Sequence, residues 1–169
     1  MTTRIASAAI ALGLVLGAAT TARGESLRAG AHIPTGRPIG RVIIPRLGES
    51  LVFRQGVGDA VLQYGPGHYP QTSLPGRPGT VAIAGHRVTH TRPFLHLNLL
   101  RRGDLITLAI GRARFRYRVY AMRIVSPSSL WVLMLRSRAR RLVLTTCHPP
   151  RRATYRLVVF AQQISERRF

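Results

Sequence analysis

Cys147 is the only cysteine in the 169-residue chain, so its thiol has no partner for an intramolecular disulfide. A Gly85-His86 pair lies upstream of it, and Arg156 follows it. The thiolate is the reactive form of cysteine, and a neighbouring base or cation favours that form. Histidine shuttles protons near neutral pH, and the guanidinium fork can bind an oxyanion. Cys147, His86 and Arg156 together therefore predict nucleophilic acyl transfer.

Each of the three residues also has a structural interpretation. A lone cysteine in a strand is often a small buried hydrophobe, and a histidine after glycine is often an ordinary loop residue. One arginine among 26 basic residues carries little weight by itself. The combination of the three residue types, rather than any one of them, favours the catalytic interpretation.

Three strand-like segments must position these side chains. Leu142–Thr146 leads into the cysteine, Tyr155–Ala161 carries the arginine, and Thr80–Ala84 ends just before the Gly85-His86 pair. If the first two segments are adjacent antiparallel strands, the cysteine and the arginine lie opposite each other, with the guanidinium close to the thiol. The histidine then enters the site at the end of Thr80–Ala84.

The remaining pattern predicts an all-β domain. Short apolar runs predict further strands at Arg41–Pro45, Leu51–Arg54, Leu105–Ile110 and Phe115–Val125. Short helical turns are expected within Gly58–Tyr64 and Pro93–Leu100, and loops over Pro66–Gly79 and Ser126–Arg141. Short strands at regular spacing with few helices indicate a β-barrel or a sandwich.

One predicted strand has an unusual polar face. Arg114, Arg116 and Arg118 alternate with Phe115 and Tyr117, which is typical of a half-buried strand with one arginine face.

The N-terminal residues are typical of a targeting sequence. Arg4 precedes an uncharged, mostly apolar run from Ile5 to Ala22, and Arg23 follows it. A cleaved signal peptide and an uncleaved membrane anchor remain alternatives, and both place the following domain outside the cytoplasm. We therefore divide the chain into a signal peptide or anchor (1–23), a linker (24–37) and one domain (38–169).

The charge of the chain is strongly unbalanced. It has 26 basic and 5 acidic residues, a formal net charge of +21, and every basic residue is arginine. The complete arginine bias indicates a GC-rich genome, and the excess charge favours anionic lipid, anionic wall polymer or nucleic acid. The arginines are scattered through strand-like segments without a recognition motif, so a nucleic-acid partner is not expected.

No metal or other cofactor is expected from the sequence. The acidic residues are few and scattered, and the histidines lack the regular spacing of metal ligands. His68, His90 and His96 are interpreted as loop residues.

Several motifs occur together in an order that resembles the sortases, which are cysteine transpeptidases of Gram-positive surfaces. They are Val81–Arg87 followed by Pro93-Phe94, and Leu144–Cys147 followed by Arg156. Three further blocks are similar to the class E group of high-GC actinobacteria, namely Gly65–Pro70, Leu74–Gly76 and Cys147–Pro149. The resemblance extends from about Ile43 to Ala161. One departure is Val143, which stands where the family often has threonine.

The resemblance implies an eight-stranded sortase-type β-barrel with one or two short helices. It implies that Cys147 attacks the Thr–Gly bond of a sorting signal of the LPxTG or LAxTG type and forms a thioester. His86 would then protonate the leaving amine, and Arg156 would bind the substrate backbone and stabilise the oxyanion. An amine of a peptidoglycan precursor, or of another surface protein such as a pilin, would resolve the thioester.

The resemblance also suggests three substrate-binding residues and a cellular location. Thr146 would assist through its backbone or hydroxyl, or is an ordinary strand residue. Trp131, in the Ser126–Arg141 loop, would line the sorting-signal groove or belong to the core. His148 is expected beside the thiol. The protein would act outside the cytoplasm of a Gram-positive, high-GC bacterium, on surface proteins that carry sorting signals, with membrane association through its N-terminal segment.

Three functions are alternatives to that of a sortase. An L,D-transpeptidase places Ser-His-Gly next to its cysteine, and Thr145-Thr146 does not match that pattern. A non-catalytic sortase-like module that holds a sorting signal without cleaving it is a second alternative, although the presence of all three site residues argues against it. A protein that binds anionic wall polymer through its net charge is a third.

Overall fold

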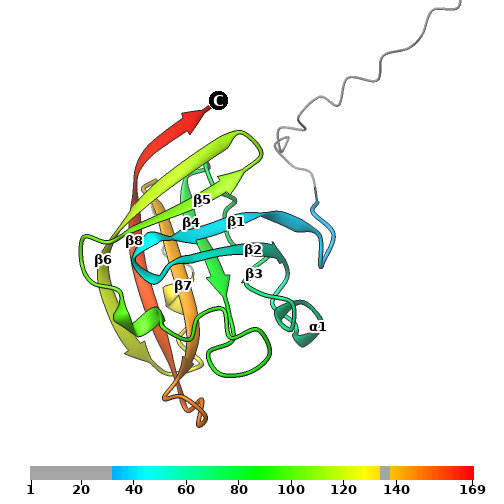
Figure 1. The fold of residues 1–169 in the computed structure, drawn as a ribbon, viewed down its shortest axis with the longest axis vertical. Helices are drawn as coiled ribbons and strands as arrows, with labels where there is room; N and C mark the ends of the chain where they lie inside the picture. Colours follow the sequence, from blue (N-terminus) through cyan, green and yellow to red (C-terminus); the bar gives the residue numbers. More distant parts are fainter. Residues whose placement is uncertain (1–31, 134–137) are drawn as a thin grey trace, which may run out of the picture.

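The structure is a computed structural model that describes residues 32–133 and 138–169 (Figure 1). The predicted signal peptide or anchor (1–23) lies outside the described residues, as does most of the predicted linker. The part of the linker that is described already contributes to the core, because Ile33 is buried against the barrel interior. Within the described ranges, no helix has the length and apolar character needed to cross a membrane.

Eight strands close into a barrel in the order β1-β2-β3-β4-β7-β8-β6-β5, which confirms the predicted all-β class and the eight-stranded barrel. The strands are β1 (Pro38–Ile44), β2 (Glu49–Gln55), β3 (Gly67–His68), β4 (Gly79–Ala84), β5 (Leu105–Ile110), β6 (Ala113–Val125), β7 (Arg140–His148) and β8 (Tyr155–Arg168). The helical elements are short: α1 (Asp59–Leu62) and the 3-10 turns η1 (Pro45–Leu47), η2 (Leu97–Leu99) and η3 (Leu130–Val132).

Side chains alternate between the two faces of the barrel wall, as the period of two along a strand requires. On β7, Leu142 and Leu144 lie in the barrel interior, whereas Val143 faces outward. The outward face of β4, β7 and β8 has its own apolar cluster, covered by the β6–β7 connection. This outward cluster consists of Ala82, Val132, Leu133, Val143, Val158 and Phe160.

The predicted arginine face is confirmed on β6. Phe115 and Tyr117 are buried in the interior, and Arg114, Arg116 and Arg118 project from the opposite face of the strand. The period-two pattern was sufficient here because the apolar residues alone determine which face of the strand is buried.

The segment Pro66–Gly79 differs from the predicted loop, because it contains the two-residue strand β3 and the first residue of β4. β3 pairs in parallel with β2 and in antiparallel with β4. A strand this short has no periodicity of its own, and its proline- and glycine-rich surroundings hid it. It forms because its two neighbours supply the hydrogen-bonding partners.

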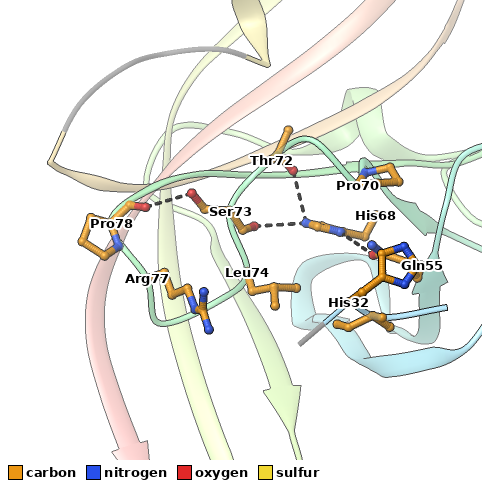
Figure 2. Close-up of a pocket in the computed structure, with 10 residues that line it drawn as sticks. His32, Gln55, His68, Pro70, Thr72, Ser73, Leu74, Arg77 and Pro78 are labelled. Atoms are coloured by element: carbon orange, nitrogen blue, oxygen red, sulfur yellow. Dashed lines mark hydrogen bonds between the residues drawn. The ribbon is translucent and has the colours of Figure 1, made fainter. Parts of the chain in front are cut away.

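His68 lies in β3 and is fully buried, so its interpretation as a loop residue is wrong. Its Nδ1 is 2.8 Å from Gln55 Oε1, and its Nε2 is 3.0 Å from the carbonyl oxygen of Ser73 and 3.1 Å from Thr72 Oγ1. Figure 2 shows these groups on the wall of a cavity of about 600 Å³. Both ring nitrogens have partners, so His68 links β2 to the β3–β4 connection.

The buried ring of His68 predicts a pH-dependent stability. Burial lowers the pKa of His68 below its usual 6.5, although the hydrogen bond with Ser73 opposes the shift. The unfolded chain therefore takes up this proton first, and the free energy of unfolding should fall as the pH drops through 6.5. Urea unfolding between pH 7.5 and 5.5 should show that His68→Gln has a shallower loss of stability than the wild type. His96 is exposed, so His96→Gln should keep the wild-type slope. Equal slopes in wild type and His68→Gln would contradict the prediction.

Candidate active site

The three predicted catalytic residues form a row at the neighbouring ends of β4, β7 and β8: the strand register pairs Cys147 with Arg156, and His86 follows the end of β4 by two residues. β4 and β7 are parallel, and their last paired residues are Ala84 and Thr145. β7 and β8 are antiparallel, and Cys147 is directly opposite Arg156. His86 lies two residues beyond the last β4–β7 pair on the β4 side, and Cys147 lies two residues beyond it on the β7 side. The β4–β5 connection and the β7–β8 turn accordingly lie at the same end of the barrel, the lower end in Figure 1.

The row lies on the outward face of the wall. Cys147 is two residues beyond Thr145 and four beyond Val143, which faces outward, so the thiol projects from that same face. Arg156 is likewise two residues before the outward-facing Val158. The thiol is half-buried. The candidate nucleophile therefore stands at the edge of the outward apolar cluster, where an extended apolar substrate segment can lie next to it.

Gly85 and Phe94 fix the path of the chain at His86. A Cβ added at Gly85 would lie 2.6 Å from the ring of Phe94, so only glycine permits this close packing. The backbone N–H of Phe94 also donates to the carbonyl oxygen of His86 at 3.1 Å. This contact is the physical reason that the Gly85-His86 pair and Pro93-Phe94 occur together.

Thr146 supports the same strand end. Its buried hydroxyl donates to the carbonyl oxygen of Gly85 at 2.7 Å, and the N–H of Gly85 donates to the carbonyl oxygen of Thr145 at 3.1 Å. The hydroxyl of Thr146 is therefore engaged with β4. A substrate contact through its backbone stays a prediction.

The environment of His86 favours a neutral imidazole. Burial and the neighbouring His90, whose ring centroid is 4.8 Å away, lower the pKa of His86, while Asp59 opposes this shift. Within the described residues, Nε2 of His86 is buried and has no hydrogen-bond partner. A neutral ring with an unengaged nitrogen can accept the proton of a thiol and pass it on.

Arg156 has its backbone beside Cys147 as predicted, but its guanidinium is engaged elsewhere. Nη1 donates to the carbonyl oxygens of Ala153 and Tyr155 at 2.9 and 3.0 Å, in the exposed β7–β8 turn. The structure thus brings the backbones of the two residues together, while the guanidinium must leave the turn carbonyls to reach the thiol.

The other two predicted substrate-binding residues lie on either side of the row. Trp131 is exposed and stacks on Phe160, with ring centroids 6.3 Å apart and an interplanar angle of 13°. It therefore extends the outward apolar cluster to the surface. His148 is half-buried, and its Nδ1 accepts a hydrogen bond from Arg87 at 2.8 Å.

Arg87 is the site residue to which sequence reasoning assigned no role. It is buried, and its guanidinium reaches the carbonyl oxygen of Cys147, the ring of His148 and the side chain of Asn98. Its position after His86 was the only signal in the sequence, and burial of one arginine among many cannot be read from composition.

The site residues offer no metal-binding cluster. Within residues 32–133 and 138–169, no group of three or more histidine, cysteine or acidic side chains could hold a metal ion. The cavity in Figure 2 is lined by His32, His68 and Arg77 among others, and Cys147, His86 and Arg156 are not part of its lining. The three predicted catalytic residues offer the chemistry of a thiol, an imidazole and a guanidinium.

An eight-stranded barrel with a free thiol near a strand end, a histidine two residues beyond one neighbouring strand and an arginine on the other is typical of a cysteine acyltransferase site. Comparison with known proteins agrees with this class. The Sortase domain family matches residues 42–164. Sortase SrtE1 of Streptomyces coelicolor is 32% identical over 139 residues, which cover 73% of this chain and 40% of that protein.

Sortase D of Bacillus subtilis is 30% identical over 115 residues, covering 68% of this chain and 57% of that protein. The chain thus spans about half the length of these two relatives. The structure of sortase E from Streptomyces avermitilis matches with a TM-score of 0.73 and 34% identity, over 80% of this chain and 93% of that one. The chain belongs to the sortase family, whose members are cysteine transpeptidases, and within it is similar to the class E sortases.

The contact between Gly85 and Phe94 can be tested by adding a methyl group. Gly85→Ala forces the Phe94 ring to move, and overpacking of this kind costs about 1–3 kcal/mol. We expect a lower midpoint of thermal unfolding and displacement of His86. Gly58 has an ordinary φ of −73° and open space at its Cβ, so Gly58→Ala is the matched control and should cost less. Equal stability losses in the two variants would contradict the packing argument.

The electrostatics of His86 predict opposite effects for two single substitutions. His90→Asn removes the interaction with His90 that lowers the pKa of His86, so this pKa should rise. Asparagine also tolerates the positive φ of 52° at position 90. Asp59→Asn removes a neighbouring anion, so the pKa of His86 should fall further. Titration of the His86 ring protons by NMR measures both shifts. Shifts of the same sign in the two variants would show that the neighbouring charges do not act as described.

Proposed function

We propose that this chain is an extracytoplasmic cysteine transpeptidase that cleaves a sorting signal of the LPxTG or LAxTG type between threonine and glycine. The acyl group is transferred to an amine of a cell-wall precursor or of another surface protein. The observation that carries the proposal is the row of His86, Cys147 and Arg156 across β4, β7 and β8. Membership of the sortase family supports the reaction type.

The reaction begins with attack of Cys147 Sγ on the carbonyl carbon of the threonine. His86 takes the thiol proton, and the carbonyl becomes an oxyanion. When the C–N bond breaks, His86 gives this proton to the glycine nitrogen, and a thioester remains on the enzyme. An incoming amine attacks the thioester, forms a new amide and restores the thiol. Protons and bonds balance without a cofactor.

Arg156 stabilises the oxyanion in this scheme. Its backbone is opposite that of Cys147, so a change of side-chain rotamers moves the fork from the turn carbonyls to the substrate. The two backbone carbonyls are exposed and can be hydrated when the arginine leaves, so the exchange costs little. Substrate binding thereby orders Arg156.

The outward apolar cluster is the proposed binding surface for the sorting signal. It leads along β7 towards the thiol, and Trp131 extends it at the surface. An extended peptide with leucine and proline or alanine before its threonine can bury apolar side chains there. His148 and the backbone of Thr146 lie next to the thiol and contact the residues around the scissile bond.

The cellular setting follows from the family and the N-terminal sequence. Sortases act outside the cytoplasm of Gram-positive bacteria, and the proposed substrates are surface proteins that carry a sorting signal. We propose that residues 1–23 direct export and, if they are not cleaved, tether the domain to the membrane.

The proposal is tested with fluorogenic LPxTG and LAxTG peptides. Cys147→Ala should abolish cleavage, and the wild type should form a thioester that hydroxylamine releases. Loss of one oxyanion donor in Arg156→Ala should lower kcat by about 10²–10³. Arg152 is exposed in the same turn, and Arg152→Ala makes the same charge change as a control.

Three outcomes would overturn the proposal. Cleavage that survives Cys147→Ala would exclude the thioester mechanism. Binding of both peptides without cleavage would indicate a non-catalytic module. Affinity for anionic wall polymer that ignores Cys147 and collapses with salt, in the absence of peptide cleavage, would indicate a polymer-binding protein.

A further inference from the structure

Arg87 is a buried cation at the end of β4, immediately after His86. Only 5% of its surface is exposed. Nη1 donates to His148 Nδ1 at 2.8 Å and lies 3.4 Å from the carbonyl oxygen of Cys147, and Nη2 donates to Asn98 Oδ1 at 2.9 Å. One side chain thus contacts the backbone of the nucleophile, the residue after it and the η2 turn.

None of these partners neutralises the charge of Arg87. The three acceptors are a carbonyl, an amide and an imidazole. In the described part of the chain, the ion-paired carboxylates are Asp104 and Glu166, and both pair with other arginines. Nε of Arg87 is buried without a hydrogen-bond partner. Burial of an unpaired charge costs several kcal/mol, and a chain that needed only packing here would be more stable with an apolar residue.

The position of Arg87 explains what its side chain adds. The β4–β7 ladder has its last paired residues at Ala84 and Thr145, so backbone pairing stops before it reaches His86 and Cys147. Beyond that point, side chains connect the two strand ends. The Thr146 hydroxyl binds Gly85, and Arg87 binds the carbonyl oxygen of the cysteine itself.

Nη1 of Arg87 lies 3.4 Å from the carbonyl oxygen of Cys147, so the guanidinium is next to the residue whose thiolate can supply a compensating negative charge. Burial lowers the pKa of the Arg87 guanidinium, and negative charge on Cys147 raises it again. Such an interaction is mutual, so the guanidinium stabilises the thiolate as the thiolate stabilises the guanidinium. Arginine stays charged throughout the working pH range, so its effect does not titrate away.

Arg87 also sets the tautomer of His148. A guanidinium can only donate, so Nδ1 of His148 must accept, and a neutral ring then carries its proton on Nε2. Protonation of Nδ1 would break the 2.8 Å hydrogen bond and place a second cation beside Arg87.

We propose that Arg87 is a positioning residue that holds the strand ends of His86 and Cys147 together and favours the thiolate through its uncompensated charge. This inference rests on the proposed function only because it takes Cys147 as the nucleophile. Positioning depends on the planar fork, because three acceptors in different directions must be met at once. Stabilisation of the thiolate depends only on the charge.

The two parts of the proposal are separated by two substitutions. Cys147 is the only cysteine, so the rate of iodoacetamide alkylation of the full chain reports on it alone. Arg87→Gln removes the charge, and the pH midpoint of alkylation should rise. Arg87→Lys keeps the charge but loses the fork, so the midpoint should stay near that of the wild type. Its kcat for peptide cleavage should fall on the order of 10- to 100-fold with little change in KM.

Arg54 provides the matched control. It is a half-buried arginine on β2 whose Nη1 donates to the carbonyl oxygen of Gly36 and whose Nε is also buried without a partner. Arg54→Gln should lower stability without moving the alkylation midpoint. Circular dichroism establishes that each variant is folded. If Arg87→Gln does not fold, Asn98→Ala removes one anchor of the fork while keeping the charge, and should lower kcat with an unchanged midpoint.

Two results would overturn the inference. An alkylation midpoint in folded Arg87→Gln equal to that of the wild type would exclude the effect on the thiolate. Wild-type kcat in Arg87→Lys, or in Asn98→Ala where that variant is used, would exclude positioning. Failure of the wild type to cleave any peptide would contradict the proposed function. Alkylation needs no sorting signal, so the effect of Arg87 on the thiolate would still be tested by the alkylation midpoint.

Discussion

The parallel pairing of β4 with β7 is the constraint on which the site depends. β7 lies between a parallel neighbour, β4, whose pairing ends at Thr145, and an antiparallel neighbour, β8, whose pairing continues past Cys147. A slip of one residue in either pairing would turn the histidine or the arginine to the opposite face of the wall. Alternate residues of all three strands lie in the interior and in the outward cluster, so the register decides which side chains enter each cluster.

Regular pairing ends just where chemistry must begin, so the site is held by specific side chains. Packing of Gly85 on Phe94, the hydroxyl of Thr146 and the fork of Arg87 connect the two strand ends after the ladder stops. This arrangement leaves the backbone near the thiol open to an extended substrate, while His86 keeps an unengaged nitrogen. The chain has few acidic residues, and the buried guanidinium of Arg87 has no carboxylate partner in the described residues. Its charge is therefore available to the thiol in the proposed scheme.

Most of the fold could be predicted from local pattern. The β-branched runs at Thr80–Ala84 and Leu105–Ile110 match β4 and β5 closely, and the arginine face of β6 follows from strict alternation. β3 could not be predicted, because two residues have no period and are a strand only through their neighbours. His68 was misinterpreted for the same reason, since its partners come from separate segments that only the barrel brings together.

The sequence by itself determined the residue types available for chemistry and the strands near them. These are one thiol near the end of a strand, a histidine just after an earlier strand, and an arginine on the strand that follows the thiol. It also predicted that Cys147 and Arg156 would be opposite each other if their strands paired in antiparallel, and the structure has this pairing. Only the tertiary structure decided that the guanidinium of Arg156 donates to turn carbonyls and that Arg87 is the buried cation beside the backbone of Cys147. The reason is physical: burial and hydrogen-bond partners depend on contacts between distant segments, and 26 chemically identical cations cannot be told apart until the chain has folded.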